Sequence, residues 1–306
     1  IRLILEWRSL QKLLTTYVYS LPKQINPKSN KIHTEFNQTL TTTGRLSSTN
    51  PNLQNIPVRT DRGKLIRKSF IPKDKNYTLL CADYSQVELR IIAFLSGDSN
   101  MKNAFINNED IHRSTAARVF NVNIDDVSQE QRRNAKIVNF GIIYGVSAFG
   151  LSNQTDLTRS ESKEIINNYF KSYPKLKEYM SDQISFARDN GYVETILKRK
   201  RYLPEINSRN AILRSSAERN AINTPVQGSA ADIIKLSMIK IDHEFEKRSL
   251  SSKLLLQVHD ELVFDVHLTE IDIVKKIITD NMESVIQMDV PLKVDIGFGD
   301  NWLVAH

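Results

Sequence analysis

Two short hydrophobic runs near the end of the chain flank three polar residues. The runs are Leu254–Val258 and Leu262–Val266, and His259, Asp260 and Glu261 stand between them. Because the runs are rich in branched and aromatic residues, they predict two strands of a hairpin with the polar trio at its turn. Two adjacent carboxylates repel each other there, and if they are buried, a divalent cation would neutralise their charge. An ordinary solvated turn explains the same residues, since Asp is common in turns.

A second carboxylate follows a predicted strand in the first third of the chain. Residues Thr78–Ala82 have the pattern of a buried strand, Asp83 stands at its end, and Gln86–Ser96 predict a helix that ends at Gly97. If these elements lie beside the hairpin, Asp83 and Asp260 can share two Mg²⁺ ions about 4 Å apart, an arrangement that supports phosphoryl transfer.

Helical periodicity and breaker residues predict most of the remaining elements. The predicted helices are Ile1–Tyr19, a segment through Phe120 that follows Asp110, Glu161–Asn190 with an interruption at Pro174, Ser208–Ile222, a helix from Ser229 to about Arg248, and Glu270–Met288. Thr224 and Pro225 are expected to break the chain between the fourth and the fifth of these. The predicted additional strands are Tyr192–Leu197 and Leu292–Ile296.

Two S-x-x-E/Q patterns predict capped helix starts. Ser85 with Glu88 fits a capping box, which gives Glu88 a complete structural explanation, and Ser128 with Gln131 fits another. In the second helix, four residues at strict four-residue spacing form one stripe, about 6 Å apart along the axis. They are Arg132, Lys136, Phe140 and Tyr144.

This stripe has the chemistry of a nucleoside triphosphate site. Two cations stand near the helix N-terminus, where the dipole also favours anions, and two aromatic residues that can stack on a base follow them. An amphipathic helix with its aromatic residues in the core and its cations in water explains the pattern equally well.

Composition narrows the class of protein and its partners. The chain has 306 residues, 40 % of them hydrophobic and 25 % charged, as in ordinary globular proteins. Its one cysteine, Cys81, excludes a disulfide framework and favours a reducing compartment. The sequence contains no apolar run of membrane-spanning length and no signal peptide pattern. A net charge of +7 favours a polyanionic partner. Because the first residue is Ile1, we expect an excerpt of a longer chain.

Several polar and basic positions are candidate nucleic-acid contacts, each with a simpler explanation as solvated surface. Arg45 lies among hydroxyl residues in Thr43–Ser48, five basic residues lie within Arg59–Lys68, and His112 is a candidate phosphate contact. Asn223 and Gln227 flank the expected break and could hydrogen-bond base edges or sugars.

The chain resembles the family A DNA polymerases over nearly its whole length. Five motifs carry this resemblance and occur in the family's order: TGRLSSTNPNLQNIPVR (43–59), DYSQVELR (83–90), RRNAKIVNFGIIYG (132–145), AINTPVQGSAADIIK (221–235) and QVHDELVF (257–264).

The resemblance implies an α+β right-hand polymerase fold, with an antiparallel palm sheet and mostly helical fingers. Residues 1–40 would form the base of the thumb, 41–97 the first part of the palm, 98–220 the fingers, and 221–306 the second part of the palm with the catalytic hairpin. The resemblance also implies that this stretch lacks most of the thumb and the nuclease domains of the family, so we expect its affinity for DNA and its processivity to differ from those of the family. The family's Asp-Gly turn near Arg199 is replaced by Leu197-Lys198, so we expect a local change there.

The resemblance also implies a role for each matching residue in primer-directed addition of dNTPs to DNA. It implies catalytic roles for Asp83 and Asp260. Glu261 would assist them, and Lys136 would protonate the leaving pyrophosphate. It implies two Mg²⁺ ions held by Asp83, Asp260 and the backbone carbonyl of Tyr84. It implies nucleotide contacts by Gln86, Glu88, His112, Arg132, Lys136, Phe140 and Tyr144. It implies contacts with primer–template DNA by Arg45, Arg59, Arg219, Asn223, Gln227 and His259.

Two of these residues carry finer expectations. Glu88 matches the residue that excludes ribonucleotides by blocking a 2′-hydroxyl, and Phe140 in place of Tyr implies poor use of dideoxynucleotides. The resemblance further implies a monomer without membrane contact, cytoplasmic at the bacterial nucleoid or in an organelle.

Three other functions fit part of the sequence. A single-subunit RNA polymerase has a similar hand but typically carries Ser where this chain has Glu261. A metal-dependent nuclease would use the two carboxylates, yet it leaves the stripe in Ser128–Gly145 without a use. A fragment that binds nucleic acid without catalysis is the third alternative.

Overall fold

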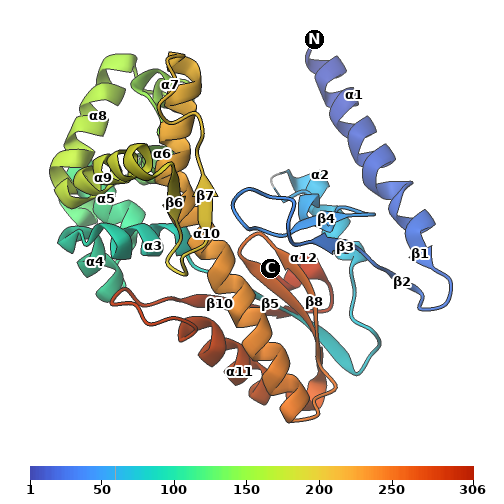
Figure 1. Cartoon of the computed structure of the whole chain (residues 1–306). Coiled ribbons are helices and arrows are strands. Elements are labelled where there is room, and N and C mark those ends of the chain that lie inside the picture. The colour runs from blue at the N-terminus through green and yellow to red at the C-terminus, as the bar shows by residue number, and fades with distance from the viewer. Residues whose placement is uncertain (59) are drawn as a thin grey trace. The chain divides into compact units, whose positions relative to one another are not determined.

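The computed structural model describes residues 1–58 and 60–306 and divides into two compact units (Figure 1). The first unit comprises Ile1–Ser85, Ile234–Val285 and Val294–His306, and the second comprises Gln86–Ile233 and Ile286–Lys293. No helix in the described part of the chain is long and apolar enough to cross a membrane.

A four-stranded antiparallel sheet forms the centre of the first unit. Its strands follow the order β10 (Val294–Gly299), β5 (Tyr77–Tyr84), β9 (Glu261–His267) and β8 (Lys253–Val258). The predicted hairpin is therefore confirmed as β8 and β9, and the predicted strand before Asp83 is β5, which pairs with β9. This pairing brings the two carboxylate-bearing segments side by side, although about 180 residues separate them in sequence.

Alternation along the strands gives the sheet two buried faces, because successive side chains point to opposite sides. On one face, Leu79, Cys81 and Val263 form a core cluster with Trp302 of α12 (Trp302–Ala305). Asp83 lies two residues beyond Cys81 and Glu261 two residues before Val263, so both acids belong to this face, where they pair in register.

The opposite face packs against two helices. The phenol of Tyr84 is 2.8 Å from the Ser237 hydroxyl of α10 (Ala211–Lys247) and donates to the Met282 carbonyl of α11 (Ile271–Glu283) at 2.7 Å. Phe264 of β9 contacts Phe245 of α10, with ring centroids 6.0 Å apart. Figure 1 shows α11 running alongside β10.

Glycine in β10 allows α12 to lie directly on the sheet. A Cβ atom at Gly297 would stand 2.2 Å from the Ala305 carbonyl oxygen, so no other residue fits there without displacing backbone. The close approach carries Trp302 into the core of the first unit, where it is fully buried.

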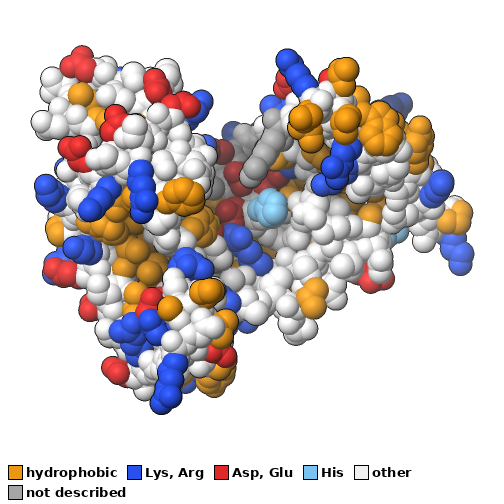
Figure 2. Space-filling model, turned by 90° about the horizontal axis from the view of Figure 1, so that it is seen from above, with side chains coloured by type: hydrophobic (Ala, Val, Ile, Leu, Met, Phe, Trp, Pro, Cys, Tyr) orange, Lys and Arg blue, Asp and Glu red, His pale blue; other side chains and the backbone are white. Residues whose placement is uncertain are grey.

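The rest of the first unit consists of short elements and one exposed helix. The short elements are η1 (Leu14–Val18), η2 (Leu21–Gln24), β1 (Ile25–Asn26), β2 (Lys31–Ile32), β3 (Glu35–Asn37), β4 (Ser47–Thr49), η3 (Leu53–Asn55), α2 (Asp61–Lys64), η4 (Leu65–Ser69) and η6 (Leu268–Glu270). The predicted first helix is α1 (Arg2–Leu13), which contains no buried residue and exposes Leu3, Ile4 and Trp7. Exposed hydrophobic side chains are visible on the face shown in Figure 2.

The second unit is mostly helical. Its helices are α3 (Val87–Ser96), α4 (Ser99–Ile106), α5 (Ile111–Phe120), η5 (Ile124–Asp126), α6 (Gln129–Ile143), α7 (Ala148–Ser152), α8 (Arg159–Ser172), α9 (Pro174–Asn190) and the first part of α10, with one small hairpin, β6 (Tyr192–Glu194) and β7 (Lys200–Tyr202). The predicted interruption at Pro174 is confirmed, and Gly191 ends α9 in the left-handed conformation.

The predicted break at Thr224 and Pro225 is wrong, because α10 runs unbroken through both residues. Proline removes one hydrogen bond from a helix interior and costs about 3 kcal/mol there. Tertiary packing outweighs this cost here, since Ala221, Thr224 and Val226 are all almost fully buried. In addition, the Ser229 hydroxyl donates to the Pro225 carbonyl at 2.5 Å.

Of the two predicted capping boxes, one is confirmed and one is wrong. Ser128 and Gln131 form both reciprocal bonds at the start of α6. Helix α3 instead begins after Gln86, which adopts a left-handed conformation with φ of 53°, and its N-cap makes no side-chain capping bond. A left-handed residue turns the chain sharply after β5, and Glu88 is buried in the second unit.

The hairpin that carries Leu197-Lys198 closes on a lysine in a strained conformation. Lys198 has φ of 66°, the left-handed region that glycine adopts without steric cost, and its N–H donates to the Thr195 carbonyl at 3.0 Å. The hairpin is anchored to α10 by Asp232, whose carboxylate accepts bonds from Thr195 and from Arg199 at 2.6–2.8 Å.

Candidate active site

Two aspartates from distant parts of the sequence meet at one end of the sheet in the first unit. Asp83 is the penultimate residue of β5, and Asp260 is in the turn between β8 and β9. The N–H of Tyr84 donates to the Asp260 carbonyl at 3.1 Å, which holds the turn against the end of β5. Both carboxylates line a cavity of about 230 Å³ together with His259 and Glu261.

The turn that carries Asp260 is rigidly held. His259 adopts φ of 56°, which is uncommon for a residue with a side chain. The Gln257 side chain donates to the His259 carbonyl, and Gln54 donates to the Gln257 carbonyl at 3.1 Å and to its side-chain oxygen at 3.0 Å. These hydrogen bonds from glutamine side chains hold the backbone of the turn that carries Asp260.

The two aspartates carry negative charge that the described residues neutralise only weakly. Burial, and then the charges of Asp260 and Glu261, raise the pKa of Asp83 to about 6. Burial also raises the pKa of Asp260, against which Arg45 acts from 3.8 Å. Paired carboxylates that resist ionisation together are suited to a hard divalent cation.

The donor set limits the kind of metal site that the chain can form. Among the described residues there is no group of three or more His, Cys, Asp and Glu side chains able to hold a metal ion. Mg²⁺ differs from structural metals in this respect, because proteins often bind it through one or two carboxylates while water and substrate phosphates complete its shell. Asp83 and Asp260 fit that pattern.

Glu261 differs from the two aspartates because its surroundings favour its ionised form. Its carboxylate accepts from Trp302 Nε1 at 3.0 Å and lies 3.3 Å from His306 Nδ1 and 3.7 Å from the Arg67 guanidinium. Burial alone would raise its pKa, but the hydrogen bonds from His306, Cys81 and Trp302 outweigh this and lower it. Glu261 therefore anchors the hairpin to α12.

Sequence reasoning missed the residues that compensate Glu261. Arg67 belongs to the basic run that suggested a solvated face or a phosphate contact, yet only 3 % of its surface is exposed, and its guanidinium lies 4.2 Å from the Trp302 ring centroid. His306 and Trp302 carried no pattern that distinguished them. The pairing of Arg67 with an acid almost 200 residues away depends on tertiary contacts, which a local pattern does not encode.

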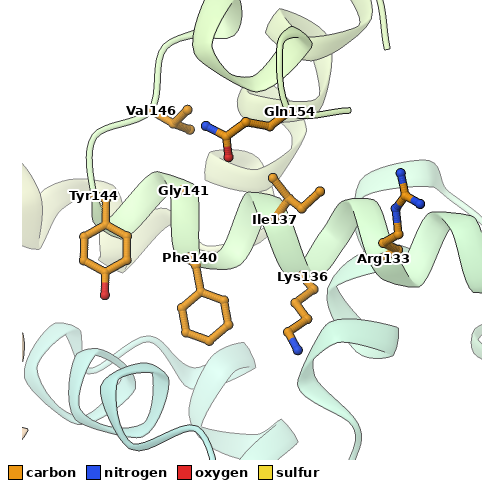
Figure 3. Close-up of a pocket in the computed structure, with 8 residues that line it drawn as sticks. All are labelled: Arg133, Lys136, Ile137, Phe140, Gly141, Tyr144, Val146 and Gln154. Atoms are coloured by element: carbon orange, nitrogen blue, oxygen red, sulfur yellow. The ribbon is translucent and has the colours of Figure 1, made fainter. Parts of the chain in front are cut away.

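The second unit arranges the predicted stripe along one side of α6. Figure 3 shows Lys136, Phe140 and Tyr144 projecting to the same side, with Ile137 on the other, around a cavity of about 470 Å³. Arg132 continues the stripe one turn earlier, and its Nε atom donates to the Asp110 carboxylate at 2.6 Å. This bond uses one nitrogen of the guanidinium, so the terminal nitrogens keep donors for an anion.

Two further predicted nucleotide residues contact the stripe. The Tyr144 hydroxyl donates to the carboxylate of Glu88, which is 5 % exposed. The His112 ring lies 5.8 Å from the Phe140 ring. Burial lowers the pKa of His112 to about 4, with Lys136 and Arg132 acting in the same direction and Asp110 against it. Gln86 is half-buried at the start of α3.

The predicted DNA-contacting residues divide between the two units. In the second, Arg219, Asn223 and Gln227 follow one another at four-residue spacing on α10 and so share one side of that helix. In the first, Arg45 lies beside Asp260, and the loop before it is fixed by Lys235, which donates to the Gly44 carbonyl at 2.5 Å. Arg59 lies outside the described residues.

Comparison with known proteins identifies the family. The sequence model for DNA polymerase family A matches residues 1–304. The chain belongs to DNA polymerase family A. It is 53 % identical to DNA polymerase I of Caldicellulosiruptor bescii over 98 % of this chain, and 50 % identical to that of Bacillus subtilis over 99 %. The chain spans about a third of the length of these relatives, 35 % and 34 % respectively.

A solved family A structure has the same fold. The POL domain of Pol1 from M. smegmatis, in complex with DNA primer-template and dNTP, matches with a TM-score of 0.93 and 44 % identity. The match covers 97 % of this chain and 52 % of that chain. The predicted α+β polymerase fold is therefore confirmed, with the antiparallel sheet in the first unit and mostly helices in the second.

We expect Asp83→Asn and Glu261→Gln to change stability in opposite directions at neutral pH in a metal-free buffer. The folded-state pKa of Asp83 is raised from 3.8 to about 6, so its ionisation costs stability above pH 6, and this cost disappears as the pH falls toward 3.8. Asp83→Asn should raise the free energy of unfolding at pH 7.5 by about 2 kcal/mol, at 1.36 kcal/mol per pKa unit with allowance for partial exposure.

Glu261 has the opposite sign, because its folded-state pKa is lowered. Its contribution is present above the unfolded pKa near 4.5 and is lost as the pH falls through the folded value. Glu261→Gln should therefore destabilise the chain at pH 7.5. Urea unfolding with EDTA at pH 7.5 and 4.5 measures both effects, and destabilisation by Asp83→Asn at pH 7.5 would contradict the repulsion assigned to the aspartate pair.

Proposed function

We propose that this chain carries out template-directed DNA synthesis, adding dNTPs to a primer 3′-hydroxyl by phosphoryl transfer with release of pyrophosphate. The observation that carries the proposal is the pair of poorly neutralised carboxylates, Asp83 and Asp260, which line one cavity at the end of the sheet in a family A member. Two such carboxylates could hold the pair of metal ions that phosphoryl transfer uses.

The proposed cofactor is a pair of Mg²⁺ ions. Asp83, Asp260 and the backbone carbonyl of Tyr84 would hold them, and oxygen donors of this kind fit Mg²⁺. When bound, the ions would supply charge that lowers the pKa of the primer hydroxyl and stabilises the transferring phosphoryl group. Glu261 would act indirectly, since its bonds to α12 hold the turn that aims Asp260.

The side chains along α6 would bind and orient the incoming nucleotide. Arg132 and Lys136 supply cations for the triphosphate, and the Lys136 ammonium would also transfer a proton to the leaving pyrophosphate. Phe140 and Tyr144 supply aromatic surface for the base and sugar. Gln86 and His112 would complete the nucleotide contacts, and Phe140 in place of Tyr is expected to give poor use of dideoxynucleotides.

The polymer partner would be primer–template DNA. The net charge of +7 favours a polyanion, and the M. smegmatis relative was solved with primer-template and dNTP. Arg219, Asn223 and Gln227 on α10, with Arg45 and His259 in the first unit, would contact it. Arg59 remains a sixth predicted DNA contact.

The domain names of a polymerase hand extend the same proposal. Residues 41–97 and 221–306 would be the palm, 98–220 the fingers and 1–40 the base of the thumb. A monomer located at a bacterial nucleoid or in an organelle is the state that we propose for the whole protein.

One rival function is weakened by a specific contact. A metal-dependent nuclease could use Asp83 and Asp260, but it has no need of a stripe that pairs cations with aromatic residues, and Tyr144 is tied to the buried Glu88. An RNA polymerase would admit a 2′-hydroxyl. A buried carboxylate bound to the stripe's last aromatic residue supports exclusion of that group.

Replacing either aspartate should abolish synthesis. We expect Asp83→Asn and Asp260→Asn each to lower kcat by about a thousandfold or more, because loss of metal charge at the transition state costs several kcal/mol and about 1.4 kcal/mol is tenfold. Primer extension with labelled primer–template measures kcat, and an electrophoretic shift measures DNA binding, which should change by less than about tenfold.

Asp265→Asn is the matched control, since Asp265 is a buried carboxylate on β9 that bonds to the Lys73 backbone. It should retain near-normal turnover. Near-normal turnover by either Asp83→Asn or Asp260→Asn would defeat the metal assignment, and degradation of the primer without dNTPs would favour the nuclease.

Shortening Glu88 should relax the choice of sugar. We expect Glu88→Ala to raise the ratio of rNTP to dNTP incorporation by about tenfold or more, because the shorter side chain no longer blocks the 2′-hydroxyl of an rNTP. A tenfold change corresponds to a penalty of about 1.4 kcal/mol removed from rNTP incorporation. Single-nucleotide incorporation kinetics with each substrate measures this. Tyr144→Phe, which keeps the Glu88 side chain, should change the ratio less, and an unchanged ratio in Glu88→Ala would remove Glu88 from sugar selection.

A further inference from the structure

A chain of four buried polar side chains links three helices of the second unit. His112 and Thr115 are on α5, Asn139 is on α6, and Tyr173 follows α8. None of the four is more than 3 % exposed. The Thr115 hydroxyl is 3.0 Å from the Tyr173 hydroxyl and 3.1 Å from Asn139 Oδ1, and Asn139 Nδ2 is 3.0 Å from His112 Nδ1.

The direction of each hydrogen bond follows from the number of hydrogens available. The Thr115 hydroxyl donates its one hydrogen to Asn139 Oδ1, so the Tyr173 hydroxyl donates to Thr115. With its oxygen engaged in this way, the Asn139 amide presents N–H to the imidazole. His112 Nδ1 must therefore accept, and a neutral imidazole that accepts at Nδ1 carries its hydrogen on Nε2.

The surroundings of His112 oppose a positive charge on the ring. A protonated ring would place N–H against the N–H of Asn139. The charged groups that face the ring are Asp110 at the start of α5 and Arg132 and Lys136 on α6. Burial and the two cations lower the pKa of His112 by more than the Asp110 carboxylate raises it. His112 is also the second residue of a ten-residue helix, where the dipole disfavours cations.

The other ring nitrogen is available for a ligand. The described residues show no hydrogen-bond partner for His112 Nε2, and this atom is not among their buried atoms without a partner. The ring lies 5.8 Å from the Phe140 ring, and Arg132 and Lys136 both act on its charge, so the imidazole lies beside the predicted triphosphate site.

We propose that Asn139 is a positioning residue that holds His112 as a neutral, Nε2-protonated hydrogen-bond donor for the triphosphate bound along α6. The proposal rests on the proposed function for the identity of the anion. A neutral donor adds a directed bond beside two cations without adding a third charge, so it binds the triphosphate while leaving the departing pyrophosphate less tightly held.

Reversal of the Asn139 amide gives the opposite state. Its carbonyl would then face Nδ1, which would have to carry the hydrogen, and Nε2 would present a lone pair that repels phosphate oxygens. The two states are distinguishable by spectroscopy without any turnover.

The test is the protonation state of His112 in the whole chain labelled with ¹⁵N-histidine, read from long-range ¹H–¹⁵N spectra between pH 8 and pH 5.5. His112→Gln assigns the signal. We expect one neutral Nε2–H form over this range. Asn139→Leu should give mixed tautomers with a pKa nearer the ordinary value, and Asn139→Asp should give an imidazolium, because a carboxylate accepts from Nδ1–H.

Asn134→Leu is the matched control, because Asn134 is also a buried asparagine on α6, whereas the hydrogen bond from α6 to His112 among the described residues comes from Asn139. It should leave the His112 signals unchanged. A wild-type Nδ1–H tautomer or imidazolium would overturn the proposal, as would an unchanged single Nε2–H tautomer in Asn139→Leu. If Asn139→Asp does not fold, judged by thermal unfolding, wild type and Asn139→Leu still decide.

Kinetics connect this state to nucleotide binding. In primer extension, Asn139→Leu should raise KM for dNTP by about tenfold, the value of one hydrogen bond of about 1.4 kcal/mol, with a smaller change in kcat. In the His112→Gln background the same substitution should have no further effect on KM. An undiminished effect there would show a general structural role and overturn the proposal. If wild type shows the expected tautomer but extends no primer, the proposed function fails and the tautomer assignment stands.

Discussion

The central constraint in this structure is the electrostatic repulsion between the carboxylates of Asp83 and Asp260, which the fold holds close together. Antiparallel pairing of β5 with β9, and the Tyr84 N–H bond to the Asp260 carbonyl, hold two aspartates at one end of a buried sheet. Burial and the neighbouring charge raise the pKa of Asp83 to about 6, and the Arg45 guanidinium lies 3.8 Å from the Asp260 carboxylate. Because a bound metal ion relieves the repulsion between the two carboxylates, holding them together favours cation binding.

Glu261 is a third acid on the same sheet, and its negative charge is stabilised by neighbouring side chains of the chain itself. It pairs in register with Asp83, yet Trp302, His306 and Arg67 surround it. The short helix that supplies Trp302 lies so close to β10 that a side chain at Gly297 or Gly299 would collide with its backbone. A glycine in one strand thus permits the helix contact that anchors the hairpin turn, and the turn in turn aims Asp260.

Much of this could be predicted from the sequence, and the failures have identifiable causes. The hairpin and the strand before Asp83 follow from hydrophobic runs of strand length, and the stripe on α6 follows from four-residue spacing. The break at Pro225 was wrong because burial of the surrounding α10 residues outweighs a local proline cost. The capping box at Ser85 was wrong because Gln86 takes a left-handed conformation that a spacing rule does not register. Arg67 and Asn139 were missed because their partners are determined by tertiary packing.

Metal binding to the aspartate pair tests the central claim most directly. The chain, labelled with ¹³C at its aspartate carboxyl groups, is mixed with primer–template that lacks a 3′-hydroxyl and with the matching dNTP, and a small amount of Mn²⁺ is added. The account predicts that the Asp83 and Asp260 signals broaden together while that of Asp265 stays sharp. Broadening of only one of the two, or of neither, would contradict a metal site that both aspartates share.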